Sequence, residues 1–332
     1  MREQEPAGIP APDASQRRVM PAPALATLGR GLLRLNRKFE VAELKVLFAT
    51  SESAPLIKTG GLADVSGALP AALRAIGVDV RVLVPGYNQV IAQLAQHRVE
   101  AVFDALPGFP AARLLSGIMP NQVPLYVLDC PSLYQREGGP YQNAAGHDWV
   151  DNALRFGMLS KVAAMLGSGA SPLAWHPDLV HCNDWQTGLT PAYLHFAQGA
   201  APSVITIHNL AFQGIFPPVT ASQLHLPPSC FSINGVEFHG SLSFLKAGLF
   251  YADHITTVSP NYAKEIQQEL LGSGLHGLLS TRRDDLTGIL NGIDTDEWDP
   301  SGDPYLAMHY SRAHMEGKAA NKESLQSRLG LN

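Results

Sequence analysis

Short apolar runs alternate with helical periods along most of this chain. From Lys45 onward, each apolar run is closed by polar residues or glycine and followed by a stretch with helical periodicity. The runs are almost continuously apolar, which is typical of strands that are covered on both faces of a sheet. The predicted strands are Lys45–Ser51, Val78–Pro85, Pro124–Cys130, Asp178–Asp184, Ser203–Asn209, His254–Ser259 and Leu286–Gly292.

The segments between these runs are predicted to be helical. They are Leu62–Ile76, Trp149–Leu166, Leu189–Phe196, Leu242–Tyr251 and Pro260–Leu271. The last begins with Ser259-Pro260, a hydroxyl N-cap followed by proline in the first helical position. Strands that alternate with helices predict an α/β fold with a doubly wound, mostly parallel sheet.

Both ends of the chain depart from this pattern. Residues 1–43 are rich in Pro and Ala and then basic, with a short basic amphipathic helix predicted at 28–39. We predict a basic, disordered extension; an organelle transit peptide is the alternative, which the acidic residues of the first half disfavour. Residues 293–332 contain no further strand, and 321–331 is predicted to be a polar helix or linker.

The composition excludes several classes of protein. Hydrophobic residues are 45% and charged residues 16% of the 332, which is enough for a buried core. The net charge of −5 lacks the basic footprint of a nucleic-acid-binding protein. No apolar run reaches the roughly 20 residues that span a bilayer. The three scattered cysteines form neither a CxxC pair nor a disulfide framework, so a reducing compartment is expected.

The most informative polar residues follow the predicted strands. Ligands of open parallel sheets bind beyond the carboxyl ends of the strands. The first strand leads through Lys58-Thr59-Gly60-Gly61 into a helix. Glycines let phosphates approach the backbone, and a helix N-terminus with a nearby lysine attracts anions. An ordinary strand-to-helix turn explains the same residues equally well.

Later strands end in a carboxylate, an imidazole and amides. These residues are Asp184, His208, Asn209 and Asn291, and Tyr141, Trp185 and Phe212 are nearby aromatic candidates. A single such residue at a strand end is usually structural, but several together indicate a polar ligand. Dense hydrogen bonding beside an aromatic platform is what a sugar requires.

Other motifs are set aside. Gly272–Gly277 matches the dinucleotide fingerprint GxGxxG but follows a predicted helix instead of a strand, which disfavours a nicotinamide-dependent oxidoreductase. The acidic run Asp294–Asp299 lacks the spacing of a calcium loop. His181 beside Cys182 has no second ligand pair, so no metal site is predicted.

Taken in order, these segments resemble the bacterial glycogen synthase and plant starch synthase family. The resemblance starts at Lys58-Thr59-Gly60-Gly61-Leu62-Ala63-Asp64-Val65 and covers roughly Lys45 to Leu331. It continues through His181–Leu189, Thr206–Gly214, Gly235–Asp253, Thr257–Ser259 and Leu290–Asp294. It implies a GT-B fold of two Rossmann-like domains facing a cleft, of which this chain holds the N-terminal, acceptor-side one. The expected boundaries are 44–292 for that domain and 293–332 for a linker into a C-terminal domain that this sequence lacks.

The resemblance also implies roles for individual residues. Asp184 and His208 are then the catalytic residues at the transferred glucose. Lys58, Thr59, Gly60 and Gly61 are expected at the donor diphosphate, and Asp64, Tyr141, Asn209 and Asn291 at the sugars.

The implied reaction is the transfer of glucose from ADP-glucose to an α-1,4-glucan with retention of configuration, without cofactor or metal. A bacterial cytoplasm is the expected location and a plastid the alternative. The alternatives for function are a UDP-glucose-dependent GT-B transferase and a non-catalytic glucan-binding remnant.

Overall fold

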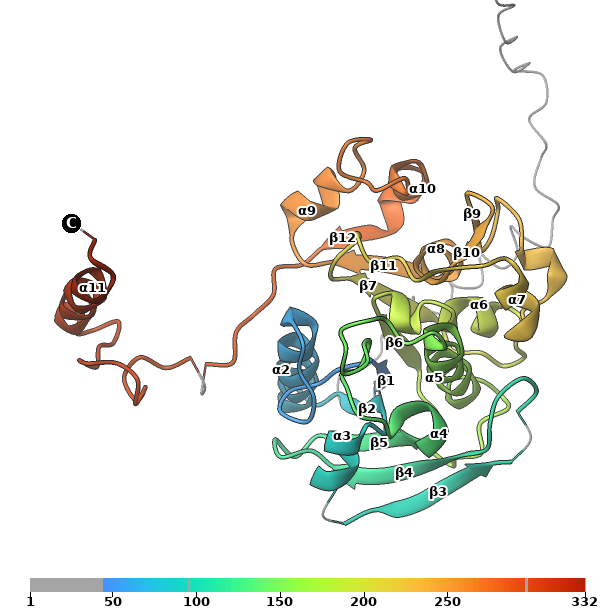
Figure 1. The fold of residues 1–332 in the computed structure, drawn as a ribbon, viewed down its shortest axis with the longest axis horizontal. Helices are drawn as coiled ribbons and strands as arrows, with labels where there is room; N and C mark the ends of the chain where they lie inside the picture. Colours follow the sequence, from blue (N-terminus) through green and yellow to red (C-terminus); the bar gives the residue numbers. More distant parts are fainter. Residues whose placement is uncertain (1–43, 95, 105, 296–297, 332) are drawn as a thin grey trace, which may run out of the picture. The chain divides into compact units, whose positions relative to one another are not determined.

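A sheet of nine strands organises the molecule (Figure 1). The structure, a computed structural model, describes residues 44–94, 96–104, 106–295 and 298–331. The strand order is β12-β11-β7-β6-β1-β2-β5-β4-β3. The strands are β1 (Lys45–Ala49), β2 (Asp79–Pro85), β3 (Arg98–Phe103), β4 (Ala112–Ile118), β5 (Pro124–Asp129), β6 (Leu179–Asn183), β7 (Ser203–Ile207), β11 (His254–Thr257) and β12 (Leu286–Gly288).

The sheet is parallel from β12 to β5 and antiparallel at β5-β4-β3. A small antiparallel sheet contains β8 (Ile215–Phe216), β10 (Ser241–Ser243) and β9 (Glu237–Phe238). The helices are α2 (Gly61–Ala75), α3 (Asn88–Gln93), α4 (Pro131–Tyr134), α5 (Asn152–Leu166), α6 (Thr190–His195), α7 (Val219–Gln223), α8 (Phe244–Tyr251), α9 (Pro260–Glu265), α10 (His276–Thr281) and α11 (Glu316–Leu329). Single 3₁₀ turns occur at Trp185–Thr187, Pro228–Cys230 and Arg283–Asp285.

The direction of winding reverses at β1. The connection through α2 leads from β1 to β2 on one side, whereas α5 leads from β5 back across the sheet to β6 on the other side of β1. Because parallel crossovers are right-handed, opposite directions place the two helices on opposite faces, as Figure 1 shows. The loops after β1 and β6 therefore diverge at a topological switch point, which is where open α/β sheets bind ligands.

The central strands are buried because they are apolar on both faces. Leu47, Phe48 and Ala49 of β1 are fully buried, as are Val80 and Val82 of β2. This continuous burial confirms the prediction that near-continuous apolar runs form a sheet covered on both sides.

Helix α2 contains a proline that ties it to the loop after β1. Pro70 has no N–H to donate to the carbonyl of Ser66 four residues earlier. The Ser53 hydroxyl donates to that carbonyl instead, at 2.9 Å. This bond fixes the loop after β1 against the helix that follows it.

The doubly wound, mostly parallel α/β fold is as predicted, whereas several predicted bounds are wrong. The strand expected at Ser203–Asn209 ends at Ile207, and that at Leu286–Gly292 ends at Gly288. The helix expected at Pro260–Leu271 ends at Glu265, although Ser259 does cap it by accepting a hydrogen bond from the Tyr262 N–H. Sequence reasoning missed β3, β4 and the small sheet. The polar C-terminal helix is present but begins at Glu316. The predicted extension 1–43 and its helix lie outside the described residues.

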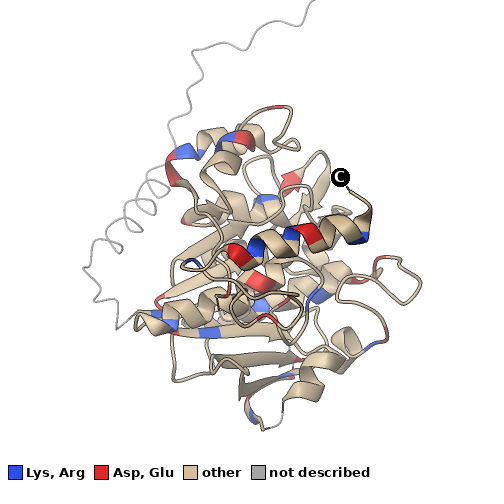
Figure 2. Ribbon diagram, turned by 90° about the vertical axis from the view of Figure 1, so that its left-hand side faces the viewer, with Lys and Arg blue, Asp and Glu red and all other residues tan. Residues whose placement is uncertain are grey.

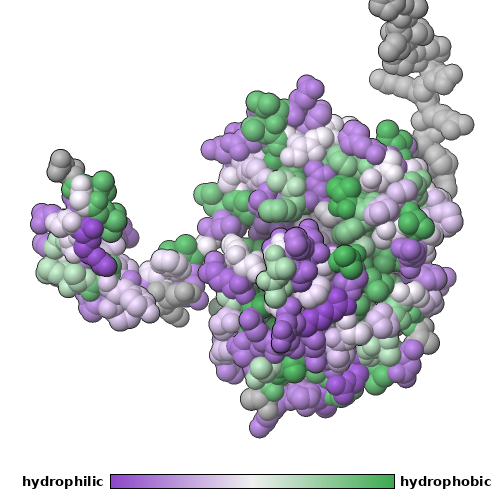
Figure 3. Space-filling model, viewed as in Figure 1, coloured by the Kyte–Doolittle hydropathy of each residue, from purple (hydrophilic) through white to green (hydrophobic). Residues whose placement is uncertain are grey.

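The surface mixes charges and polarities. Figure 2 shows acidic and basic residues interspersed, including along α11. In Figure 3 hydrophilic side chains gather near the middle of the face. Among the described residues, no helix combines the length and the hydropathy that a membrane crossing requires.

Candidate functional site

A buried carboxylate organises the turn after β1. Glu52 is 2% exposed, and its two oxygens accept hydrogen bonds from the Thr59 N–H at 2.5 Å and the Thr59 hydroxyl at 2.8 Å. The turn then enters α2, whose N-cap residue Gly60 provides no side-chain cap. The first N–H groups of α2 thus have no capping side chain, and such a helix terminus favours an anion.

Lys58 and Asp64 lie at the exposed edge of this turn. The Lys58 ammonium and the Asp64 carboxylate form an ion pair of 2.6 Å, and both side chains are about half exposed, at 52% and 51%. An exposed pair of this kind contributes little to stability, roughly 0.2–1 kcal/mol. Lys58 is therefore positioned at the surface of the turn without being needed for the core.

Tyr141 joins the same carboxylate from a distant loop. Its hydroxyl donates to Glu52 and lies 2.9 Å from the Ser51 hydroxyl. Burial, reinforced by the negative charge of Glu52, raises the pKa of Tyr141 well above its usual value, so the phenol stays protonated. Glu52 thus connects the glycine turn to Tyr141, which lies 89 residues further along the chain.

Helix α5 holds the loop that carries Tyr141. The Asn152 amide donates to the Tyr141 carbonyl at 2.9 Å, and the buried Arg155 guanidinium donates to the carbonyls of Leu133 and Pro140 at 2.8 Å each. These bonds run from a rigid helix to backbone carbonyls, so the loop has a fixed conformation without secondary structure of its own.

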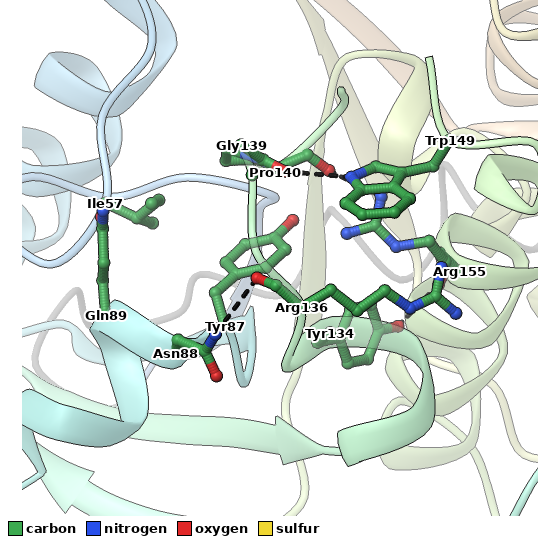
Figure 4. A pocket seen from close by; sticks show the side chains of 11 residues that line it. Ile57, Tyr87, Asn88, Gln89, Tyr134, Arg136, Gly139, Pro140, Trp149 and Arg155 are labelled. Carbon is green, nitrogen blue, oxygen red and sulfur yellow. Dashed lines mark hydrogen bonds between the residues drawn. The ribbon is translucent and has the colours of Figure 1, made fainter. Parts of the chain in front are cut away.

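A small cavity lies beside this loop (Figure 4). Its volume is about 20 Å³, the size that a single water molecule requires. Trp149 stacks over the Arg155 guanidinium at 5.6 Å along one wall. Tyr87, on the opposite side, is buried and its hydroxyl makes no hydrogen bond within the part of the chain that the structure describes. The cavity is too small for a sugar ring and borders the site without forming it.

Asp184 follows β6 in a strained conformation. Its φ of 54° and ψ of −170° lie in a region that side-chain-bearing residues rarely adopt and that costs roughly 1–3 kcal/mol. Its carboxylate accepts hydrogen bonds from the backbone N–H groups of His208 at 2.7 Å and Asn209 at 3.4 Å. The strained backbone therefore directs a carboxylate, only 7% exposed, across the ends of β6 and β7.

The environment of Asp184 favours its protonated form. Burial raises the pKa of Asp184 to about 7; the two backbone hydrogen bonds oppose the rise, and the negative charge of Glu52 adds to it. The influence of Glu52 also shows that the carboxylates after β1 and β6 interact electrostatically across the switch point.

His208 follows β7 and is held neutral. Burial lowers the pKa of His208 to about 4. Its Nε2 atom lies 3.0 Å from the Asn183 side-chain oxygen, at the end of β6. A neutral imidazole at this strand end can orient a hydroxyl group but carries no charge at pH 7.

The structure gathers most of the residues predicted for the site into two groups, one around the turn after β1 and one at the ends of β6 and β7. Asp184 contacts the backbone of His208 and Asn209, and Glu52 links Thr59 to Tyr141. Asn291 is the exception. It is exposed, lies three residues beyond the end of β12, and makes no hydrogen bond to any described residue.

The motifs that were set aside show no sign of a cofactor or metal site among the described residues. Gly272–Gly277 comes after α9 and includes the first two residues of α10, so it does not follow a strand. Cys130, Cys182 and Cys230 are buried and unpaired. Within the described ranges, no group of three or more His, Cys, Asp or Glu side chains is placed to hold a metal ion.

Sequence reasoning missed Glu52 and Asn183. A lone acid between serines has no diagnostic spacing, and an asparagine beside Asp184 is overshadowed by its neighbour. The only available signal is their position, three residues after β1 and at the end of β6, where the switch point lies.

Comparisons with known proteins give consistent matches. The family model for the starch synthase catalytic domain matches residues 45–281. A glycogen synthase of Nitrosomonas eutropha is 60% identical over 293 residues, which cover 87% of this chain and 58% of that protein. A glycogen synthase of Nitrosospira multiformis is 57% identical, with 87% and 59% covered.

A solved structure gives the same result. The catalytic domain of starch synthase IV from Arabidopsis thaliana, bound to ADP and acarbose, matches with a TM-score of 0.68 and 28% identity, covering 87% of this chain and 59% of that one. This chain spans about three fifths of the length of the curated relatives that it matches. On the family match, the identity and the shared fold, the chain belongs to the starch synthase catalytic domain family.

Proposed function

We propose that this chain provides the acceptor-side half of an enzyme that transfers glucose from ADP-glucose to the 4-hydroxyl at the non-reducing end of an α-1,4-glucan. Residues 44–292 form that half, and residues 293–332 lead toward a second domain. The single observation that carries the proposal is the electrostatic interaction across the switch point between the buried Asp184 and Glu52, which holds the uncapped glycine turn. The relatives, a glycogen synthase and a starch synthase solved with ADP and acarbose, supply the substrate class.

The glycines of the turn support a phosphate ligand. A Cβ atom at Gly60 or Gly61 would meet no atom within 4 Å, and neither residue has a positive φ. The fold itself therefore does not require glycine there. At Gly67, in contrast, a Cβ would lie 2.6 Å from the Ala54 carbonyl oxygen, so packing explains that residue. Space that is left open at a helix N-terminus suits a diphosphate that must approach the backbone.

The reaction breaks the bond between the anomeric carbon and the diphosphate oxygen and forms a bond from that carbon to the acceptor oxygen. The proton of the acceptor hydroxyl passes to the departing phosphate, and the configuration is retained because attack and departure occur on one face. Lys58 and the α2 N-terminus stabilise the negative charge that develops on the diphosphate.

Two further residues act at the sugar. Asp184, when ionised, stabilises positive charge on the sugar ring, and His208 orients a sugar hydroxyl. Tyr141, Asp64, Asn209 and Asn291 are assigned to sugar contacts. No step needs an enzyme nucleophile, cofactor or metal. The bacterial relatives support a cytoplasmic location over a plastid.

A radiolabel assay tests the proposal. The chain is assayed alone and fused to the C-terminal remainder of the Nitrosomonas eutropha relative, with ¹⁴C-labelled ADP-glucose or UDP-glucose and glycogen. We expect transfer by the fusion, preference for ADP-glucose, and a loss on the order of 10²-fold in kcat for Asp184→Ala or His208→Ala. Asp104→Asn, at an exposed position, is the matched control.

Three results would contradict parts of the proposal. Preference for UDP-glucose would overturn the donor assignment. Glucan binding without transfer by the fusion would favour a binding module. Near-normal kcat in both alanine variants would remove Asp184 and His208 from the chemistry.

A further inference from the structure

The side chain of Asn183 is held in one orientation from two sides. Asn183 is 1% exposed, and the Thr187 hydroxyl bonds both its N–H, at 2.6 Å, and its carbonyl, at 2.9 Å. Its side-chain nitrogen donates to the Ala49 carbonyl on β1 at 3.0 Å. A carbonyl oxygen can only accept, so the amide nitrogen must face Ala49 and the amide oxygen must face the other way.

The amide oxygen of Asn183 faces the ring of His208. The Asn183 oxygen lies 3.0 Å from Nε2 of His208 and has no proton to give. The hydrogen bond therefore requires a proton on Nε2. Since the ring is neutral, its single proton is at Nε2 and the Nδ1 atom carries a lone pair.

The Nδ1 atom is open to a ligand. His208 is partly exposed, and its Nδ1 makes no hydrogen bond to any residue that the structure describes. It is also not among the buried polar atoms that lack a partner, so it reaches solvent. Burial alone lowers the His208 pKa. Of the neighbouring titratable groups, His181 on β6 interacts electrostatically with His208, Asp184 accepts a hydrogen bond from the His208 backbone N–H, and Glu52 acts on Asp184.

We propose that Asn183 is a positioning residue that fixes His208 as the Nε2–H tautomer, so that His208 offers its ligand an acceptor at Nδ1 and no donor. This assignment rests on the proposed function for the identity of the ligand, a sugar hydroxyl. His208 then selects a group that can donate a hydrogen bond. A hydroxyl meets that requirement, whereas hydrogen or a methoxy group at the same carbon does not.

The tautomer is measurable without any assay of activity. Two-bond ¹H–¹⁵N correlation spectra of the chain labelled with [¹⁵N]histidine distinguish the two nitrogens of each ring, and His208→Gln identifies the His208 signals by their loss. We expect Nε2–H alone in the wild type between pH 6 and 8, a range above the pKa of about 4. An Nδ1–H tautomer, or an equal mixture, in the wild type would overturn the proposal.

Two variants separate positioning from a merely structural role. Asn183→Asp places a carboxylate beside Nε2, so the His208 pKa should rise and the ring should become doubly protonated at a higher pH than in the wild type. Asn183→Ala removes the acceptor, and both tautomers should then appear. The signals of His181, whose Nε2 bonds Thr206 at 2.7 Å, serve as the internal control. Unchanged His208 signals in both folded variants would refute the role of Asn183.

Kinetics test the ligand side of the proposal in the active fusion. Among donors that lack one glucose hydroxyl, we expect one to lose roughly tenfold in kcat/KM, the value of one hydrogen bond. That loss should disappear in His208→Ala. If the wild-type fusion transfers glucose but no deoxy penalty depends on His208, this inference fails while the proposed function stands. If the fusion transfers nothing, the proposed function fails and the spectra still decide the tautomer.

Discussion

Replacing Asp184 by asparagine should make the protein more stable while removing activity. The ordinary pKa of 3.8 rises to about 7 in the folded protein, mainly through burial. Between pH 3.8 and pH 7 the folded protein keeps the proton on Asp184, whereas the unfolded chain releases it. The contribution of Asp184 to the free energy of unfolding therefore falls as the pH rises and is lowest above pH 7. This rise in pKa corresponds to a destabilisation of the folded state by at most about 4 kcal/mol at pH 8.

Asparagine is a suitable replacement because its oxygen can still accept from the N–H groups of His208 and Asn209. Urea unfolding of the wild type and Asp184→Asn should show the variant more stable at pH 8 by about 2–4 kcal/mol. Near pH 4 the difference should be much smaller, because the folded wild type is still protonated at this residue and roughly half of the unfolded wild type is protonated as well.

Comparing the two proteins at each pH isolates Asp184 from the buried histidines. The pKa values of His181 and His208 are lowered to about 4, so these rings destabilise the fold below pH 6.5 in both proteins alike. Asp104→Asn, at an exposed residue, is the control and should change stability little at any pH. If Asp184→Asn is no more stable than the wild type at pH 8, or if its gain in stability is the same at pH 4 and pH 8, Asp184 does not carry a raised pKa.

The remaining predictions concern the turn, the cavity and the packing around the site. Lys58→Ala should raise the KM for ADP-glucose and leave the melting temperature within a few degrees, since its pair with Asp64 is exposed; an unchanged KM would remove Lys58 from the donor site. Tyr87→Phe should be neutral or stabilising by thermal unfolding, because it removes a buried hydroxyl without a partner among the described residues; a loss above about 1 kcal/mol would reveal a bound partner. Gly188→Ala should destabilise by about 1–3 kcal/mol or more in urea unfolding, because its Cβ would lie 2.2 Å from the Phe244 carbonyl oxygen; near-wild-type stability would contradict this packing.

The sequence predicted the central strands because burial on both faces leaves a strong apolar signal. It missed β3 and β4 because they lie at or near an antiparallel edge, where polar residues such as Arg98, Glu100 and Arg113 interrupt the pattern. The strands of the small sheet have two or three residues, too few for any periodicity. The start of α9 was predictable from its Ser-Pro cap, but its end depends on local turns.

The site was predictable as far as strand ends determine it. Asp184 and His208 directly follow β6 and β7, so the parallel register brings them together. Asn291 was expected by the same rule, but β12 stops at Gly288 and leaves it exposed. The bridging role of Glu52 depends on a contact to Tyr141 in a loop without regular structure, and no local pattern encodes such a contact.

The reversal of winding at β1 has a consequence for folding. No hairpin or single βαβ unit contains the site, since the turn after β1 and Asp184 come to the same end of the sheet only when β1 has paired with β6. The junction of these strands closes a loop of 133 residues, as the hydrogen bond from Lys45 to Asp178 shows. Contacts between such distant parts of a chain form slowly. The binding site should therefore be among the last features to appear during refolding, and partial opening of the β1–β6 seam should abolish it at once.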